Sequence, residues 1–208
     1  IRLNQFPRTS IDKYTTLILV SGSYNQLGKD EIKKIKKWVE KGNTLITIAR
    51  GSSWAINNEL IDENLVESKE DSTHSRKNYV DASGFIGRER IGGVILKADI
   101  DLTHPIAFGY NDNSIPVYKN NNVFINKTKD DYSSVAVYSD DFHIDGYISE
   151  SNRKDYIPGS ASLIVSKIGS GRVVVFADNP NFRGTWYGTN KLFLNAIFLG
   201  DNISVPTD

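Results

Sequence analysis

The residues Gly51-Ser52-Ser53 stand where an apolar strand is expected to give way to a helix. From Gly51 to Ala55 the sequence approximates the G-x-S-x-G nucleophile elbow, with alanine in the last small position. A Ser53 hydroxyl at such an elbow would lie at a helix N-terminus, whose free N–H groups can stabilise an oxyanion. A nucleophilic serine also needs a base, and His143 follows it in suitable chain order. One hypothesis is a serine hydrolase that uses Ser53 and His143; the alternative is that Ser52 or Ser53 only caps the helix.

A second polar loop follows the apolar strand GRVVVFA and leads into the last helix. As a site, the loop could hold a carboxylate on Arg183 and a peptide or glycan on the rings of Trp186 and Tyr187. As structure, Pro180 and its flanking asparagines would make turns while the aromatic rings seal the edge of the core. The candidate ligand-binding residues of the two loops are Ser52, Ser53, Asp178, Asn179, Arg183, Trp186 and Tyr187.

The composition limits the chemistry. The 208 residues contain no cysteine, which excludes disulfides, thiolate nucleophiles and cysteine metal ligands. His74, His104 and His143 lie far apart and form no H-x-x-H or H-E-x-x-H pattern, so we expect no metal and no cofactor in this chain. Lys plus Arg (25) balances Asp plus Glu (25), and no apolar run reaches the roughly 18 residues of a membrane helix. We therefore expect no nucleic-acid partner and no membrane span.

Hydrophobic periodicity predicts alternating strands and helices in the first third of the chain. Such a β-α-β-α order indicates an α/β fold with a parallel sheet and crossover helices. The polar, weakly periodic stretch 63–93 is predicted to be an irregular surface excursion. The expected elements are strands at Arg2–Phe6, Thr16–Val20 and Thr44–Ala49, and helices at Lys29–Lys41 and Trp54–Ile61.

The second half is predicted to form short strands and a final helix. Gly169-Ser170-Gly171 separates two apolar runs and predicts a hairpin. A short helix capped by Asp101 or Thr103 is expected within ADIDLTHPIAFGY. The remaining expected elements are strands at Ile115–Tyr118, Val123–Ile125 and Ser134–Tyr138, and a helix at Thr189–Leu199.

The order of strand, loop and helix resembles the class I glutamine amidotransferase-like domain, a flavodoxin-like fold. The resemblance implies one domain over 1–208: a three-layer sandwich with a mainly parallel central sheet, a late antiparallel hairpin and a C-terminal helix. Enzymes of that class place a cysteine at the elbow and a His-Pro-Glu-type motif after the late strand. Here those positions hold Gly51-Ser52-Ser53 and Asp178-Asn179-Pro180, so the Cys-His-Glu triad is missing and amidotransferase activity is not expected.

Three segments resemble more narrowly the amidotransferase-like domain that follows the catalytic domain in some bacterial zinc carboxypeptidases of the carboxypeptidase A type. They are YTTLILVSGSYNQL, THPIAFGY and GSASLIVSKIGSGRVVVFADNPNFRGTWYGTNKLFLNAIF. This resemblance implies a secreted or periplasmic protein whose zinc belongs to an upstream peptidase domain, the expected partner. It also implies that 1–208 is excised from a longer chain. The leading interpretation is thus a non-catalytic accessory domain whose old cleft binds a peptide or glycan or packs on the peptidase.

Overall fold

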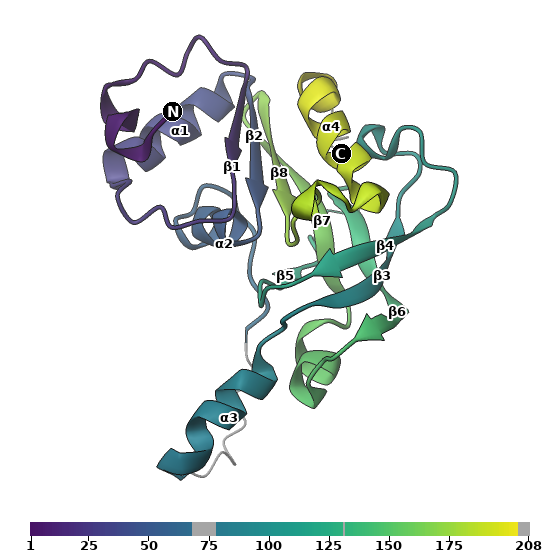
Figure 1. Ribbon diagram of the computed structural model, residues 1–208. Helices are drawn as coiled ribbons and strands as arrows, with labels where there is room; N and C mark the ends of the chain where they lie inside the picture. Colours follow the sequence, from purple (N-terminus) through teal and green to yellow (C-terminus); the bar gives the residue numbers. More distant parts are fainter. Residues whose placement is uncertain (68–77, 131, 204–208) are drawn as a thin grey trace.

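The computed structural model describes residues 1–67, 78–130 and 132–203 as a mixed sheet with helices on both faces (Figure 1). The strands are β1 (Thr16–Leu19), β2 (Thr44–Ile48), β3 (Val94–Ile100), β4 (Ser114–Lys119), β5 (Ile125–Asn126), β6 (Ser134–Gly146), β7 (Ser160–Ile168) and β8 (Gly171–Phe176). The helices are α1 (Lys29–Glu40), α2 (Arg50–Asn57), α3 (Tyr79–Glu89) and α4 (Tyr187–Leu199). Short turns of other helix types are η1 (Leu3–Arg8), η2 (Pro105–Ala107), η3 (Asn152–Tyr156), η4 (Phe182–Gly184) and η5 (Gly200–Asn202).

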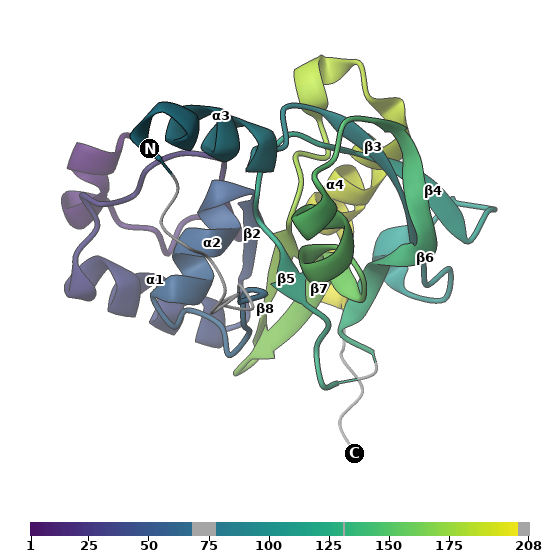
Figure 2. The same cartoon turned by 90° about the horizontal axis from the view of Figure 1, so that it is seen from below.

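The strand order is β1-β2-β8-β7-β6-β3-β4, with β5 beside β7. Helices α1 and α2 cover one face near β1 and β2, and α4 covers the other (Figures 1 and 2). The predicted α/β class, the flanking helices and the C-terminal helix are therefore confirmed.

Strands β1, β2 and β8 form the parallel part of the sheet, with Ile18, Ile46 and Val174 in one row. All five residues of β2 are buried because β2 lies between two strands and beneath helices on both sides. Because the three strands are parallel, their carboxyl ends lie side by side at the same end of the sheet. Proteins with an α/β fold usually have their binding sites at that end.

The rest of the sheet is antiparallel and more extensive than the sequence suggested, because β3, β4 and β6 follow one another without crossover helices. The predicted hairpin joins β7 to β8, with Ile168 opposite Gly171. Its first turn residue, Gly169, has φ +59°, as the tight two-residue hairpin turns require.

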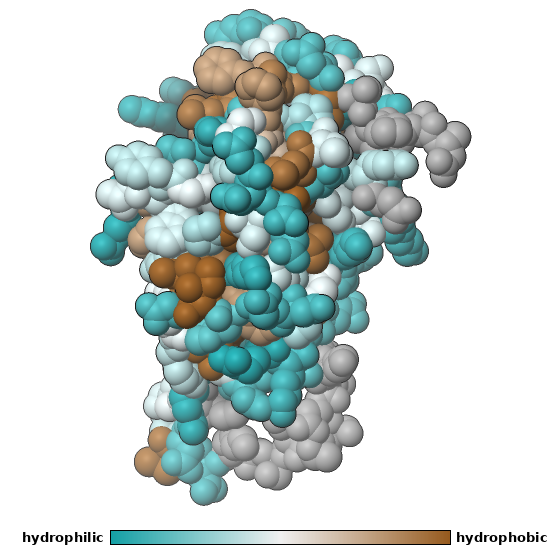
Figure 3. All heavy atoms as spheres, turned by 90° about the vertical axis from the view of Figure 1, so that its right-hand side faces the viewer, coloured by the Kyte–Doolittle hydropathy of each residue, from teal (hydrophilic) through white to brown (hydrophobic). Residues whose placement is uncertain are grey.

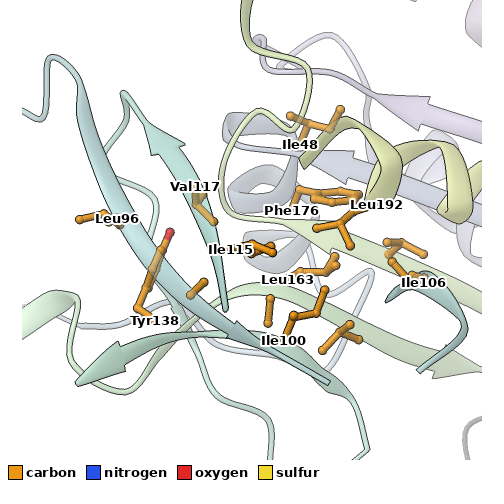
Figure 4. Close-up of a cluster of buried hydrophobic side chains, with 14 of the residues drawn as sticks. Ile48, Leu96, Ile100, Ile106, Ile115, Val117, Tyr138, Leu163, Phe176 and Leu192 are labelled. Atoms are coloured by element: carbon orange, nitrogen blue, oxygen red, sulfur yellow. The ribbon is translucent and has the colours of Figure 1, made fainter. Parts of the chain in front are cut away.

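Two hydrophobic cores lie on opposite faces of the sheet. One contains Ile35, Trp38 and Ala55 from α1 and α2. The other packs Leu192 of α4 against Ile48, Phe176 and Leu163 (Figure 4). Because Ile48, Phe176 and Leu163 lie side by side on β2, β8 and β7, this second core supports the end of the sheet that carries the candidate site.

Several element predictions were wrong. Residues 3–8 form a 3-10 turn rather than the strand predicted at Arg2–Phe6. Pro7 lacks the N–H that a sheet ladder needs, and the turn itself places the Phe6 side chain in the core. Within the expected excursion 63–93, Tyr79–Glu89 is a helix; residues 68–77 lie outside the described part of the chain. Helix α3 contributes no described side chain to either core and stands away from the body in Figure 1, so periodicity gave no signal for it.

Candidate functional site

The turn from β2 into α2 is a strained elbow, and its central residue is Ala49. The backbone of Ala49 has φ 50° and ψ −113°, a conformation that residues other than glycine rarely adopt. Its N–H donates to the carbonyl of Phe176 at 2.8 Å, and its own carbonyl accepts from the N–H of Ser52 and of Ser53. Helix α2 begins at the next residue, so the methyl group of Ala49 takes the place that a nucleophile occupies at such an elbow.

Gly51 lets the elbow pack directly on the end of β1. A Cβ at Gly51 would lie 2.4 Å from the carbonyl oxygen of Leu19 and 2.9 Å from that of Val20. Both neighbours are backbone atoms that cannot move aside alone. The sequence assigned Gly51 to the start of the elbow; the structure places it two residues after the strained position, as the second small residue of the motif.

Ser52 is a structural residue of the elbow. Its side chain is wholly buried, and its hydroxyl donates to the carbonyl of Phe176 at 2.7 Å. With its single proton used there, the Ser52 oxygen accepts from the hydroxyl of Thr47 at 2.9 Å. Ser52 therefore ties α2 to β2 and β8.

The structure does not bring Ser53 and His143 together. Ser53 is half-buried in the first turn of α2 and its hydroxyl bonds to no described residue. His143 lies on β6, three strands from β2 or roughly 14 Å at the usual spacing, beyond the part of β6 that pairs with β7. Its Nε2 contacts the carbonyl of Gly146 at 2.8 Å.

Asp178 follows β8 by two residues and lies in a buried polar cluster. One carboxylate oxygen accepts from Nζ of Lys119 at 3.0 Å. The other accepts from the Tyr138 hydroxyl and from the Ser162 hydroxyl, the latter at 3.3 Å. Asp178 is 3% exposed and Lys119 is 0% exposed. Both carboxylate oxygens are thus occupied by protein donors.

Lys119 is held by more than the carboxylate. Its ammonium also donates to the carbonyl of Val123 at 2.6 Å and lies 4.7 Å from the ring centre of Phe124. Burial lowers the pKa of Lys119, and the charge of Asp178 partly opposes that shift. Burial, reinforced by the same carboxylate, raises the pKa of Tyr138 well above its usual value. Tyr138 therefore stays a neutral donor to Asp178 over the physiological pH range.

The late loop uses its aromatic residues mainly for packing. The rings of Tyr118 and Phe182 stack at 3.9 Å between centres, with Trp186 5.9 Å from Tyr118. The indole N–H of Trp186 donates to the carbonyl of Pro116 at 3.1 Å, which fixes the loop to β4. Tyr187 is 74% exposed at the start of α4 and remains free to meet a ligand.

Arg183 and Asn179 complete the same loop. Arg183 is exposed, has φ 53° and lies over the Phe182 ring with its guanidinium 5.2 Å from the centre. The side-chain oxygen of Asn179 accepts from the N–H of Asn181 at 3.0 Å, an Asx turn of the expected kind.

Sequence reasoning missed Ala49, Lys119, Tyr138 and Ser162. The sequence did contain a signal for Ala49, because Ala49-x-Gly51 directly after a buried strand has the spacing of an elbow. It was missed because alanine cannot act as a nucleophile. Lys119 carried no signal, since 59 residues separate it from Asp178.

Metal-binding groups and membrane helices are both absent from the part of the chain that the structure describes. There, no group of three or more His, Cys, Asp or Glu side chains could hold a metal ion; His74 lies outside that part. None of the described helices is both long enough and apolar enough to cross a membrane.

Comparison with known proteins identifies the fold. No protein-family model matches the sequence, and no curated protein matches it significantly. Among solved structures, a protein described as a GMP synthase subunit from Thermoplasma acidophilum superposes with a TM-score of 0.53 at 16% identity, covering 92% of this chain and 75% of the other. PurLQS from Thermotoga maritima gives 0.52 at 16% identity over 91% and 81%. A ThuA-like protein from Parabacteroides merdae gives 0.54 at 12% identity over 96% and 75%.

The chain therefore shares the α/β fold of these structures, as its resemblance to amidotransferase-like domains implied. At these identities the likeness establishes the architecture alone, so activity has to be argued from the residues at the elbow and at the end of β8.

Proposed function

We propose that this chain is a non-catalytic binding or interaction domain: an amidotransferase-like fold that has lost its Cys-His-Glu triad. One observation carries the proposal. The strained elbow is retained, but the side chain at its apex is the methyl group of Ala49, which can neither attack a carbonyl nor exchange a proton.

The residues at the end of β8 support the same conclusion. A nucleophile needs an adjacent base to accept its proton. Asp178 cannot serve as that base, because both of its buried carboxylate oxygens already accept hydrogen bonds from Lys119, Tyr138 and Ser162. The alternative, a serine hydrolase built on Ser53, has no support from the described geometry, because Ser53 has no described histidine within hydrogen-bonding distance.

Labelling with a fluorophosphonate probe and assay of ammonia release from glutamine test this proposal. We expect neither a covalent adduct nor ammonia above the level of heat-denatured protein. An adduct that disappears in Ser53→Ala but persists in Ser52→Ala would establish the serine hydrolase instead. The Ser52→Ala control needs a folding check, since it removes the buried hydrogen bond to Phe176.

We further propose that the domain is an accessory to a secreted or periplasmic zinc carboxypeptidase, with the zinc and its ligands in an upstream domain of the same chain. The support is the resemblance of the three segments named above, of which Gly159–Phe198 is the longest. Expression of the complete reading frame, zinc analysis of the purified chain and hydrolysis of C-terminally unblocked peptides test this role. A full-length chain without bound zinc or peptidase activity would contradict it.

A further inference from the structure

The two edge strands of the sheet, β4 and β1, differ in how far they are protected from pairing with another strand. At one edge, β4 contains Pro116, whose carbonyl is covered by the indole N–H of Trp186. Proline and a covering loop are devices that keep an edge strand from pairing with another chain. On the face that includes α4 and β4, apolar side chains are dispersed among polar ones (Figure 3). Part of this edge is therefore blocked.

The other edge, β1, has no such protection from any residue that the structure describes. Within the described residues β1 pairs only with β2, and the segment Thr16–Val20 contains neither a charged residue nor a proline. Ile18 is 39% and Val20 57% exposed. An uncharged apolar edge strand of this kind readily accepts a further strand.

The backbone hydrogen-bonding groups of β1 also favour the addition of a strand at this edge. The carbonyl of Thr15 accepts from the N–H of Thr44 on β2, so the odd-numbered residues direct their backbone groups toward β2. Because these groups alternate along a strand, Thr16 and Ile18 direct their N–H and C=O away from the sheet. The carbonyl of Val20 is already bound by the Tyr24 hydroxyl at 2.6 Å, which marks the end of the free stretch.

A groove of about 520 Å³ runs along this edge. One wall is the N-terminal segment with Leu3 and Phe6, and another is the loop with Tyr24 and Leu27. Not one of the side chains that line it is charged. The volume lies in the range of sites that hold small ligands or short peptides.

We propose that this groove, made of the β1 edge and its two walls, binds an extended, uncharged apolar segment of another protein as an added strand. The free backbone groups of Thr16 and Ile18 supply main-chain pairing, and the neutral lining selects against charged side chains. A second copy of this chain fits less well: an isologous contact would set one concave groove against another and leave the space between them unfilled. The site is separate from the elbow, so the proposed lack of catalysis does not depend on it.

Fluorescence anisotropy with a labelled, end-capped Ser-Val-Thr-Val-Thr-Val-Ser peptide tests the proposal. We expect saturable binding with a Kd below about 1 mM. The same peptide N-methylated at alternate residues keeps its side chains but loses the donors on one edge. It should bind at least about tenfold more weakly, the equivalent of one or two backbone hydrogen bonds.

Ile18→Lys should weaken binding by at least about tenfold, because it places a charge in the neutral groove. Leu194→Lys on α4, at a comparably exposed apolar position (45%), is the matched control and should leave binding unchanged. Unfolding midpoints of both variants establish that they fold. If Ile18→Lys does not fold, Val20→Lys serves as a second variant of the groove.

Three results would overturn the proposal. They are the absence of binding, equal binding of the N-methylated peptide, and equal losses in Ile18→Lys and Leu194→Lys. Sedimentation that shows a dimer abolished by Ile18→Lys, without peptide binding, would assign the edge to a second copy of this chain.

Discussion

Lys119 at the end of β4 and Asp178 just beyond β8 form a 3.0 Å ion pair from which solvent is excluded on all sides. The pair ties β4, at one edge of the sheet, to the parallel strands through residues far apart in sequence. Asp178 begins the stretch Asp178-Asn179-Pro180, which the resemblance noted above aligns with a His-Pro-Glu-type motif. The carboxylate of Asp178 is thus part of the buried framework of the fold.

Asp178→Ala should lower the free energy of unfolding by about 3–5 kcal/mol, because it leaves a buried ammonium without its counter-charge. Asp12→Ala is the control: it removes a bridge to Lys41 in which both side chains are about two-thirds exposed, and should cost at most about 1 kcal/mol. Urea denaturation measures both variants. Similar small losses would show that the buried pair adds little.

The double variant Lys119→Met with Asp178→Asn should be less destabilised than the sum of its single variants. Neither partner is then left charged and alone, and the oxygen of the introduced asparagine can still accept from Tyr138. A coupling of about 0.5–3 kcal/mol is expected for groups in direct contact. Additive losses would contradict an energetic link between the two side chains.

Gly51→Ala should destabilise the protein by on the order of 3 kcal/mol, since the new methyl group would lie 2.4 Å from the Leu19 carbonyl oxygen. Gly84→Ala is a matched control in exposed α3, where nothing lies within 4 Å of a new Cβ. It should be neutral or stabilising by up to about 1 kcal/mol. Thermal unfolding of the two variants in parallel tests the contrast; tolerance of Gly51→Ala would mean that the elbow is loosely packed.

His104 should make stability depend on pH. Its Nδ1 accepts from the N–H of Ile106 at 3.1 Å, which only the unprotonated nitrogen can do. Burial lowers the pKa of His104 below the usual 6.5, an effect that Asp101 partly opposes. As the pH falls, the unfolded chain binds the proton first, so this stability is complete above about pH 6.5 and is lost between that pH and the folded-state pKa.

His104→Asn tests this dependence, because asparagine can also cap the turn but does not titrate. Urea midpoints measured from pH 7.5 to pH 5 should fall less steeply for the variant than for the native protein. Parallel curves would exclude His104 as the source.

Trp186 and Tyr187 should behave differently when changed to alanine. Trp186→Ala removes the hydrogen bond to Pro116 and the contact with Tyr118, and should cost about 3 kcal/mol or more. Tyr187 is largely exposed, so Tyr187→Ala should change stability by less than about 0.5 kcal/mol. Thermal unfolding separates them. Titration with peptidoglycan fragments then asks whether Tyr187→Ala weakens ligand binding, as a stacking surface would require.

Much of the fold follows from local sequence patterns. The strands around Ile18, Ile46 and Val174 and the turn at Gly169 were predicted closely, because buried strands and tight turns have strong local signatures. Helix α3 was missed because none of its described side chains belongs to either core, so it shows no apolar stripe. The length of β6 was underestimated, since its second half is polar and partly exposed.

The candidate site was less predictable. The elbow was assigned to Ser52 and Ser53 because a hydroxyl suggests chemistry, whereas the strained backbone belongs to the chemically inert Ala49. No short-range pattern could connect Lys119 to Asp178, since their contact depends on the complete sheet order. Backbone geometry and long-range pairing are properties of the folded chain.

The partly blocked β4 edge and the open β1 edge together limit how this protein can assemble. A filament built by lateral strand addition needs two competent ends on each molecule, one to accept and one to donate. Among the described residues, β1 is unobstructed whereas Pro116 and Trp186 interrupt the β4 edge, so growth beyond a single addition is disfavoured. The open edge therefore favours a complex of one molecule with one added strand over a growing aggregate.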